Sequence, residues 1–158
     1  MNIKNILKSK FFIFSSCIVF LGLAISIVAF CFQDKGTRRV FYFQNMDAPG
    51  IFAEIRFIKP YTEDQSLDID IKQFINDLLL GPTTNRFRNL FAYGTKLESC
   101  FLRDGILYVN ISKEALLLDS ITTPIKEAYD IFIKNILNNF SKVKEVELYI
   151  NNIKAFDY

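Results

Sequence analysis

The chain has 158 residues, 51% of them hydrophobic, a length sufficient for one globular domain together with a membrane anchor. It contains no histidine, and this excludes the common histidine-dependent metal sites and catalytic triads. Residues 40–158 carry 13 Lys and Arg against 16 Asp and Glu, a net charge of −3, so the basic excess typical of nucleic-acid-binding domains is missing and nucleic acid is not an expected partner.

The N-terminal region is predicted to be a membrane anchor. Residues 11–32 include no charged side chain over 22 positions, and three lysines precede them. As an α-helix this run would extend about 33 Å, enough to cross a hydrocarbon core of about 30 Å. It is longer than the apolar segment of a cleaved signal peptide and ends in Phe30-Cys31-Phe32 instead of small residues. The pattern predicts a single-pass signal anchor, with the lipid bilayer as its partner, after a cytoplasmic tail of residues 1–10.

Cys31 supports a competing hypothesis, in which a lipid attached to this cysteine forms the anchor. The cysteine ends the apolar run, as the modified residue of a lipoprotein does, although Phe30 stands where a small residue is expected. Cationic residues flank the run on both sides, so the charge rule alone does not set its orientation. The very short N-terminal tail favours retention in the cytoplasm. We therefore expect the C-terminal domain to be extracytoplasmic (periplasmic), on the cytoplasmic membrane.

Two strands are predicted after a polar linker at residues 33–39. Residues 40–44 are aromatic or β-branched, and a turn follows at 47–50. The second strand, residues 52–59, alternates Ala53, Ile55 and Phe57 with Glu54 and Arg56 before Pro60 ends it. Arg56, on the polar face, is the domain residue that we consider first for recognition, although a solvated arginine is the plainer interpretation.

A helix and a hairpin follow. Apolar residues recur at three- and four-residue steps from Asp68, a candidate N-cap, to Leu80. Gly81-Pro82 ends that helix, because glycine readily adopts the left-handed conformation just past the last turn and proline cannot continue the helical hydrogen bonds. Asp104-Gly105 separates two extended runs, 96–103 and 106–112, and is the sequence signal of a tight antiparallel hairpin.

A second helix and a last strand complete the domain, which is predicted to occupy residues 40–158. Thr123 and Pro124 are typical of an N-cap and a first helical residue, and the apolar periodicity then continues to Phe140. Residues 146–150 alternate as a strand. The order ββ-α-ββ-α-β predicts an α+β two-layer sandwich, with a mixed sheet of about five strands and two helices on one face.

Residues 40–156 resemble the GerMN domain, a module named for bacterial sporulation and germination proteins. The resemblance rests on the order of several short motifs: Val40-Phe41-Tyr42-Phe43, Arg56, Leu79-Leu80-Gly81-Pro82, Tyr93-Gly94-Thr95-Lys96-Leu97, the hairpin around Asp104-Gly105, and Val143-Lys144-Glu145-Val146. Asn151-Asn152 departs from the Asp-Gly-like turn expected after the last strand. The resemblance implies a non-catalytic module, carried on a membrane anchor or lipoprotein, that acts in assembly of the cell or spore envelope.

No catalytic, cofactor-binding or metal-binding residue is predicted. The acid pairs Asp68 with Asp70 and Glu145 with Glu147 have ordinary positions at a helix start and on a strand face. Cys100 has no histidine to activate it, and it cannot form a disulfide inside the domain because the other two cysteines lie in the apolar run. We expect fold-determining turns at Gly81, Pro82, Gly94, Asp104 and Gly105, and possible binding at Arg56, Asn151 and Asn152.

Two functional hypotheses follow from the sequence, and a third, an envelope hydrolase, is disfavoured by the absence of histidine. The first is an extracytoplasmic interaction module that binds an envelope protein or peptidoglycan and organises the envelope, in a sporulation- or germination-related role or another one. The second is a domain that binds a small ligand or glycan. A flat exposed patch or an open strand edge would favour the first, whereas a pocket with converging polar groups would favour the second.

Overall fold

A computed structural model describes residues 3–31, 36–60, 66–117 and 119–156. The chain divides into two compact units, residues 1–35 and 36–158, and each is described by itself. Residues 157 and 158, the last two of the predicted domain, lie outside the described part, as do residues 32–35 of the predicted anchor and linker.

The first unit is one helix, α1 (Ile3–Cys31), which begins eight residues before the predicted apolar segment. Its stretch Ile13–Cys31 has the length and composition of a membrane-spanning helix. The large apolar side chains of this stretch are exposed. A helix that is apolar all round requires an apolar environment, as the predicted anchor does.

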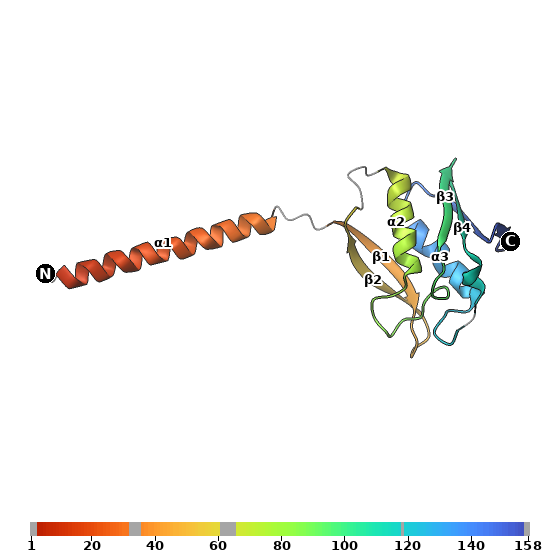
Figure 1. Cartoon of the computed structure of the whole chain (residues 1–158), viewed down its shortest axis with the longest axis horizontal. Helices are drawn as coiled ribbons and strands as arrows, with labels where there is room; N and C mark the ends of the chain where they lie inside the picture. Colours follow the sequence, from red (N-terminus) through yellow and green to blue (C-terminus); the bar gives the residue numbers. More distant parts are fainter. Residues whose placement is uncertain (1–2, 32–35, 61–65, 118, 157–158) are drawn as a thin grey trace. The chain divides into compact units, whose positions relative to one another are not determined.

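The second unit holds two sheets and two long helices (Figure 1). Strands β1 (Thr37–Gln44) and β2 (Ile51–Ile58) form an antiparallel ribbon. The larger sheet has the order β3-β4-β5-β6, in which only β4 and β5 run parallel; the bounds of its strands are β3 (Leu97–Arg103), β4 (Ile106–Ile111), β5 (Glu145–Ile150) and β6 (Ile153–Lys154). The predicted α+β class is confirmed, but the strands form two sheets in place of one.

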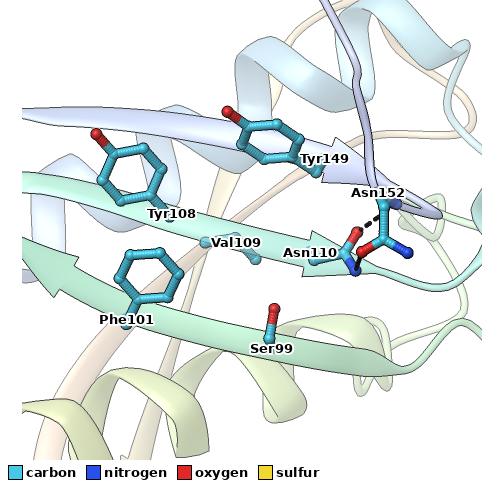
Figure 2. Close-up of a pocket in the computed structure, with 7 residues that line it drawn as sticks. All are labelled: Ser99, Phe101, Tyr108, Val109, Asn110, Tyr149 and Asn152. Atoms are coloured by element: carbon cyan, nitrogen blue, oxygen red, sulfur yellow. Dashed lines mark hydrogen bonds between the residues drawn. The ribbon is translucent and has the colours of Figure 1, made fainter.

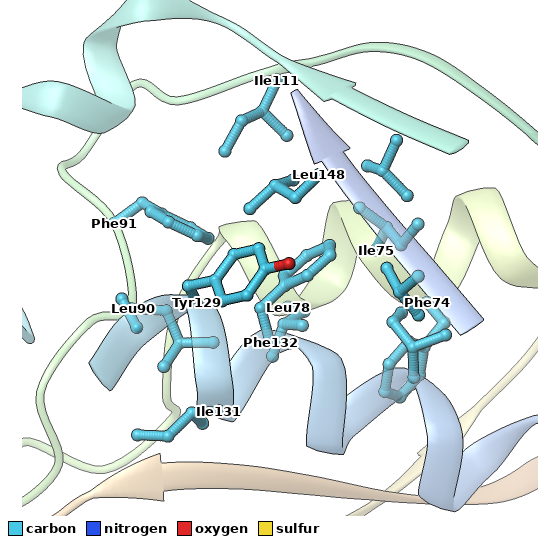
Figure 3. Close-up of a cluster of buried hydrophobic side chains, with 14 of the residues drawn as sticks. Phe74, Ile75, Leu78, Leu90, Phe91, Ile111, Tyr129, Ile131, Phe132 and Leu148 are labelled. Atoms are coloured by element: carbon cyan, nitrogen blue, oxygen red, sulfur yellow. The ribbon is translucent and has the colours of Figure 1, made fainter. Parts of the chain in front are cut away.

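The helices cover one face of the larger sheet, as predicted. Helix α2 (Leu67–Leu79) contacts β3, and helix α3 (Ile125–Asn139) contacts β5. A short 3₁₀ helix at Lys113–Leu116 was not predicted. The apolar helix faces meet alternate strand residues in a core that Figure 3 shows, with Phe74, Leu78, Phe132 and Leu148 all buried.

Two asparagines of α3 complete the hydrogen bonding of β1. The Asn135 side chain accepts a hydrogen bond from the Tyr42 N–H at 2.8 Å and donates one to the Tyr42 carbonyl at 2.9 Å. Asn139 does the same for Val40, at 3.0 and 2.7 Å. One turn apart on the helix, the two amides match alternate residues of the strand. Helix α3 therefore takes the place of a neighbouring strand, and this is why the ribbon remains a separate sheet.

Strand β2 buries the opposite face from the one that its alternation of apolar and charged residues suggests. Glu54 and Arg56 lie on the inner side with Phe41, whereas Ile55 and Phe57 are 53% and 61% exposed. The expectation that Arg56 projects into solvent from a polar outer face is therefore wrong. The physical reason is that both charged groups find partners on the inner side, and these are described below.

We expect replacement of Asn135 by leucine to destabilise the domain, because Leu has a similar size but leaves the N–H and C=O of Tyr42 buried without partners. The free energy of unfolding of residues 36–158, measured in urea, should fall by at least about 2 kcal/mol. The exposed Asn138 on the same helix provides the control, and Asn138→Leu should change the stability by less than about 0.5 kcal/mol. Equal effects of the two substitutions would contradict the role given to Asn135.

Candidate functional site

Arg56 is a structural residue in this domain. Its guanidinium donates hydrogen bonds to the carbonyls of Asp77 and Gly81, at 3.2 and 2.8 Å, and so caps the C-terminal end of α2. It also pairs with Glu54 and lies 4.3 Å from the ring centroid of Phe41. Its side chain is 17% exposed. A binding role for Arg56 stays a prediction, but its donors are directed into the domain.

Glu54 holds Arg56 in this position. Burial alone would raise the pKa of Glu54, but hydrogen bonds from Arg56 and Thr83 and the charge of Arg56 outweigh it, so the pKa is lowered. The carboxylate accepts from the Thr83 N–H as well as from the Arg56 side chain. The pair therefore joins β2 to the residues that follow α2.

The glycine turns differ in what holds them. Gly81 has φ of +89°, and a Cβ there would lie 2.3 Å from the Asn89 side-chain oxygen, so both the backbone and the space require glycine. Gly94 has φ of +90°, with open space around it. Asp104 and Gly105 both have positive φ and join β3 to β4 in the predicted two-residue hairpin. Pro82 follows Gly81 beyond the end of α2.

Asn151 and Asn152 form a turn where the sequence lacked the expected Asp-Gly pair. Their φ values of 51° and 65° are those of a left-handed two-residue turn, which asparagine tolerates, and the turn joins β5 to β6. Asn152 is fixed to Asn110: its N–H donates to the Asn110 side-chain oxygen at 3.0 Å, and its own side-chain oxygen accepts from Asn110 at 2.9 Å. A binding role for either residue stays a prediction.

The outer face of the larger sheet, opposite the helices, carries a row of aromatic side chains (Figure 2). Phe101 on β3 and Tyr108 on β4 are cross-strand partners whose rings stack with centroids 5.0 Å apart. Tyr149 lies on the next strand, β5, opposite Asn110. Phe101 is 52% exposed. We call Phe101, Tyr108 and Tyr149, together with Ser99, Asn110 and Asn152, the aromatic platform.

A shallow depression of about 300 Å³ lies over this platform. The rings occupy one end of it, and Ser99, Asn110 and Asn152 form the polar end (Figure 2). Asn110 also donates to Glu98 at 2.7 Å, and Tyr149 donates its O–H to Glu147 at 2.7 Å, which raises the pKa of Tyr149. The hydrogen bonds hold these groups in place. The platform therefore offers a preformed surface to an extended or flat ligand.

Two of the four candidate acids have side-chain partners. Asp70 pairs with Arg39, and Glu147 contacts Tyr149 and Lys154. Over residues 3–31, 36–60, 66–117 and 119–156, no three His, Cys, Asp or Glu side chains group together as metal ligands. Burial raises the pKa of the Cys100 thiol to about 12, so the thiol is protonated at neutral pH.

The aromatic platform was not predicted from the sequence. A signal was present, because Cys100, Val109 and Leu148 are core residues and the alternation of the strands then places the residues next to them on the opposite face. What the sequence did not supply was the order of the strands, in which β5 returns beside β4 and brings Tyr149 next to the Phe101–Tyr108 pair.

Comparisons with known proteins agree on one family. The Germane family model, described as "Sporulation and spore germination", matches residues 40–155. The tandem GerMN domains of the sporulation protein GerM from Bacillus subtilis have a similar structure, with a TM-score of 0.58 and 18% identity over 79% of this chain and 43% of that one. The first GerMN domain of GerM alone gives a TM-score of 0.53 and 19% identity over 75% of this chain and 85% of that one.

A curated relative is an uncharacterized lipoprotein of Treponema pallidum (strain Nichols). It is 25% identical over 87 residues, which make up 55% of this chain and 65% of the relative. The match thus spans about two thirds of that lipoprotein's length.

We expect Cys100 to be inert in the folded domain, since a pKa of about 12 leaves a thiolate fraction of about one in ten thousand at pH 8. Iodoacetamide at pH 8 should alkylate Cys100 of residues 36–158 at least about a hundredfold more slowly than the new cysteine in Ser99→Cys, an exposed position next to it. Mass spectrometry of peptides measures both rates. Rapid alkylation of Cys100 without denaturant would restore it as a candidate nucleophile.

Proposed function

This chain belongs to the Germane family, and from that membership and the aromatic platform we propose that it is a membrane-anchored, extracytoplasmic interaction module of the bacterial envelope. It binds a protein or peptidoglycan component and has no catalytic role of its own. A sporulation- or germination-related task is one form of this function, in keeping with the description of the family.

The observation that carries this proposal is a row of three aromatic side chains on one sheet face, with Phe101 exposed and Tyr108 and Tyr149 half-buried. Tyr and Phe contribute large apolar contact areas with little loss of conformational entropy, and Tyr is enriched in the energetic centres of interfaces. The platform is built on strands, and hydrogen bonds fix its polar end, so little reorganisation opposes binding. Asp70 and Glu147 have side-chain partners and Cys100 is buried and protonated, which supports recognition over chemistry.

A glycan ligand is the second candidate, and the depression over the platform favours it. Apolar rings at one end and amide groups at the other match the two chemical characters of a sugar, whose C–H faces are apolar and whose hydroxyls form hydrogen bonds. Sedimentation of the domain with purified peptidoglycan separates a peptidoglycan or other glycan ligand from a protein partner, because no second protein is present.

The anchor is proposed to be α1 itself. Its exposed apolar stretch Ile13–Cys31 is long enough to cross a bilayer. A lipid on Cys31 is the alternative, and the name of the Treponema pallidum relative is consistent with it. Labelling with radioactive fatty acid distinguishes the two, since only a lipid-modified Cys31 incorporates the label and Cys31→Ala would abolish it.

The proposal predicts that substitutions on the platform abolish function without unfolding the domain. Phe101→Ser and Tyr108→Ser should each fail to complement a deletion strain, while thermal unfolding shows that the folded state remains, because these side chains lie partly or largely in solvent. Tyr93→Ser is the matched control, at a side chain that is 88% exposed and does not line the depression, and it should complement fully.

The acids provide the opposite test of the same proposal. Glu145→Gln and Asp68→Asn should both complement, because a binding module does not depend on one carboxylate for chemistry. Loss of complementation in either variant at wild-type stability would overturn the non-catalytic assignment. Complementation by both platform variants would instead overturn the assignment of the platform.

The proposed topology predicts that the domain is accessible from outside the cytoplasm. Protease added to cells with a permeabilised outer layer should degrade the domain while a cytoplasmic marker protein survives. Protection of the domain under these conditions would reverse the proposed orientation. Alkaline extraction of the same membranes should leave both the wild-type protein and Cys31→Ala in the pellet if α1 spans the bilayer.

A further inference from the structure

Strand β2 presents an open edge. In the described residues its sheet has two strands, so β2 has one neighbour, β1. The backbone groups of Val40 and Tyr42 point toward α3, away from β2. Their partners Ile55 and Ala53 are therefore in non-hydrogen-bonded pairs, and the N–H and C=O groups of Ile55 and Ala53 point to the outer edge of β2.

The same residues carry apolar side chains that face solvent. Ile51, Ile55 and Phe57 are 44%, 53% and 61% exposed, and Ala53 between them is exposed as well. Residues 51–58 contain no lysine or proline, the residues that commonly protect an edge strand against pairing. The N–H and C=O groups at the edge of β2 and the apolar side chains on its outer face are therefore available to a partner.

We propose that β2 pairs antiparallel with β2 of a second copy of this chain, in a two-fold register centred on Ile55. This pairing places Ile55 opposite Ile55 of the second copy, and Ala53 opposite Phe57 of the second copy. A small side chain thus faces a large one. These are the residues whose backbone groups point to the open edge, so the hydrogen bonds of the two strands match.

The charges on the inner face select this register. With Ile55 on the two-fold axis, Glu54 of each copy lies opposite Arg56 of the other. A shift of two residues in one direction places Glu54 opposite Glu54 of the second copy, and a shift in the other direction places Arg56 opposite Arg56. Like charges directly opposite each other are destabilising, and opposite charges are favourable.

The charges also select the partner. Glu54 and Arg56 already pair with each other inside the domain, so a strand that places a like charge directly opposite either of them is disfavoured. A second copy in this register places the opposite charge at both positions. The edge therefore favours its own sequence over strands with like charges there, by repulsion as well as attraction.

Cysteine crosslinking of the full-length chain in isolated membranes tests the register. Cys17 and Cys31 are replaced by alanine in all variants, and the buried Cys100 is retained. Ile55→Cys should give a disulfide-linked dimer on oxidation. Ala53→Cys alone and Phe57→Cys alone should not, because each lies about 13 Å from its own copy along the strand, beyond the reach of a disulfide. The double variant Ala53→Cys with Phe57→Cys should crosslink.

Light scattering of the detergent-solubilised chain gives a second measurement that requires no cysteine. The wild-type chain should have the mass of a dimer, and Ile55→Lys should have that of a monomer, because the substitution places two lysines opposite each other. Phe101→Lys, at a strand residue of similar exposure in the other sheet, should remain a dimer. A monomeric wild-type chain, or equal crosslinking of all three single-cysteine variants, would overturn the proposal. This outcome is independent of complementation by the platform variants.

Discussion

The hydrogen bonds between two asparagine side chains and strand β1 are the interaction on which the arrangement of the domain depends. Buried backbone N–H and C=O groups must find partners, and among the described strands β1 has only β2 beside it. Asn135 and Asn139 provide the missing donors and acceptors from a helix. The ribbon can therefore end at β1 without joining the larger sheet, and α3 is fixed to both.

This arrangement decides which way the ribbon faces. Phe41 packs on Phe74 of α2 with ring centroids 4.5 Å apart, and the Arg39 guanidinium lies 4.4 Å from the centroid of Phe140 while it pairs with Asp70. Arg56, on the same inner face of the ribbon, lies over the ring of Phe41. Once the inner face is occupied by these rings and cations, the side chains of Ile51, Ala53, Ile55 and Phe57 have only the solvent side left. The domain thus exposes apolar side chains on β2 because the inner face of the ribbon is already filled by other residues.

The two proposed recognition surfaces lie on different sheets. The aromatic platform belongs to the outer face of the larger sheet, whereas the open edge belongs to the ribbon. The first is suited to a ligand or protein of the envelope and the second to another copy of the chain. Binding on one sheet therefore leaves the other free. In a membrane-anchored protein, pairing would present two platforms together and raise the effective affinity for a repetitive partner such as peptidoglycan.

The sequence by itself determined the elements whose signals are local. Asp104-Gly105 specifies a hairpin because both positions require positive φ, Gly81-Pro82 ends α2, and the apolar periodicities place α2 and α3 within one or two residues. Tertiary structure alone decided which face of β2 is buried, since alternation separates two faces without saying which one meets the core. It also decided the partners of Asn135 and the assembly of the aromatic platform. Those depend on contacts between residues far apart in the chain, such as Tyr42 with Asn135 and Asn110 with Tyr149, which local patterns do not encode.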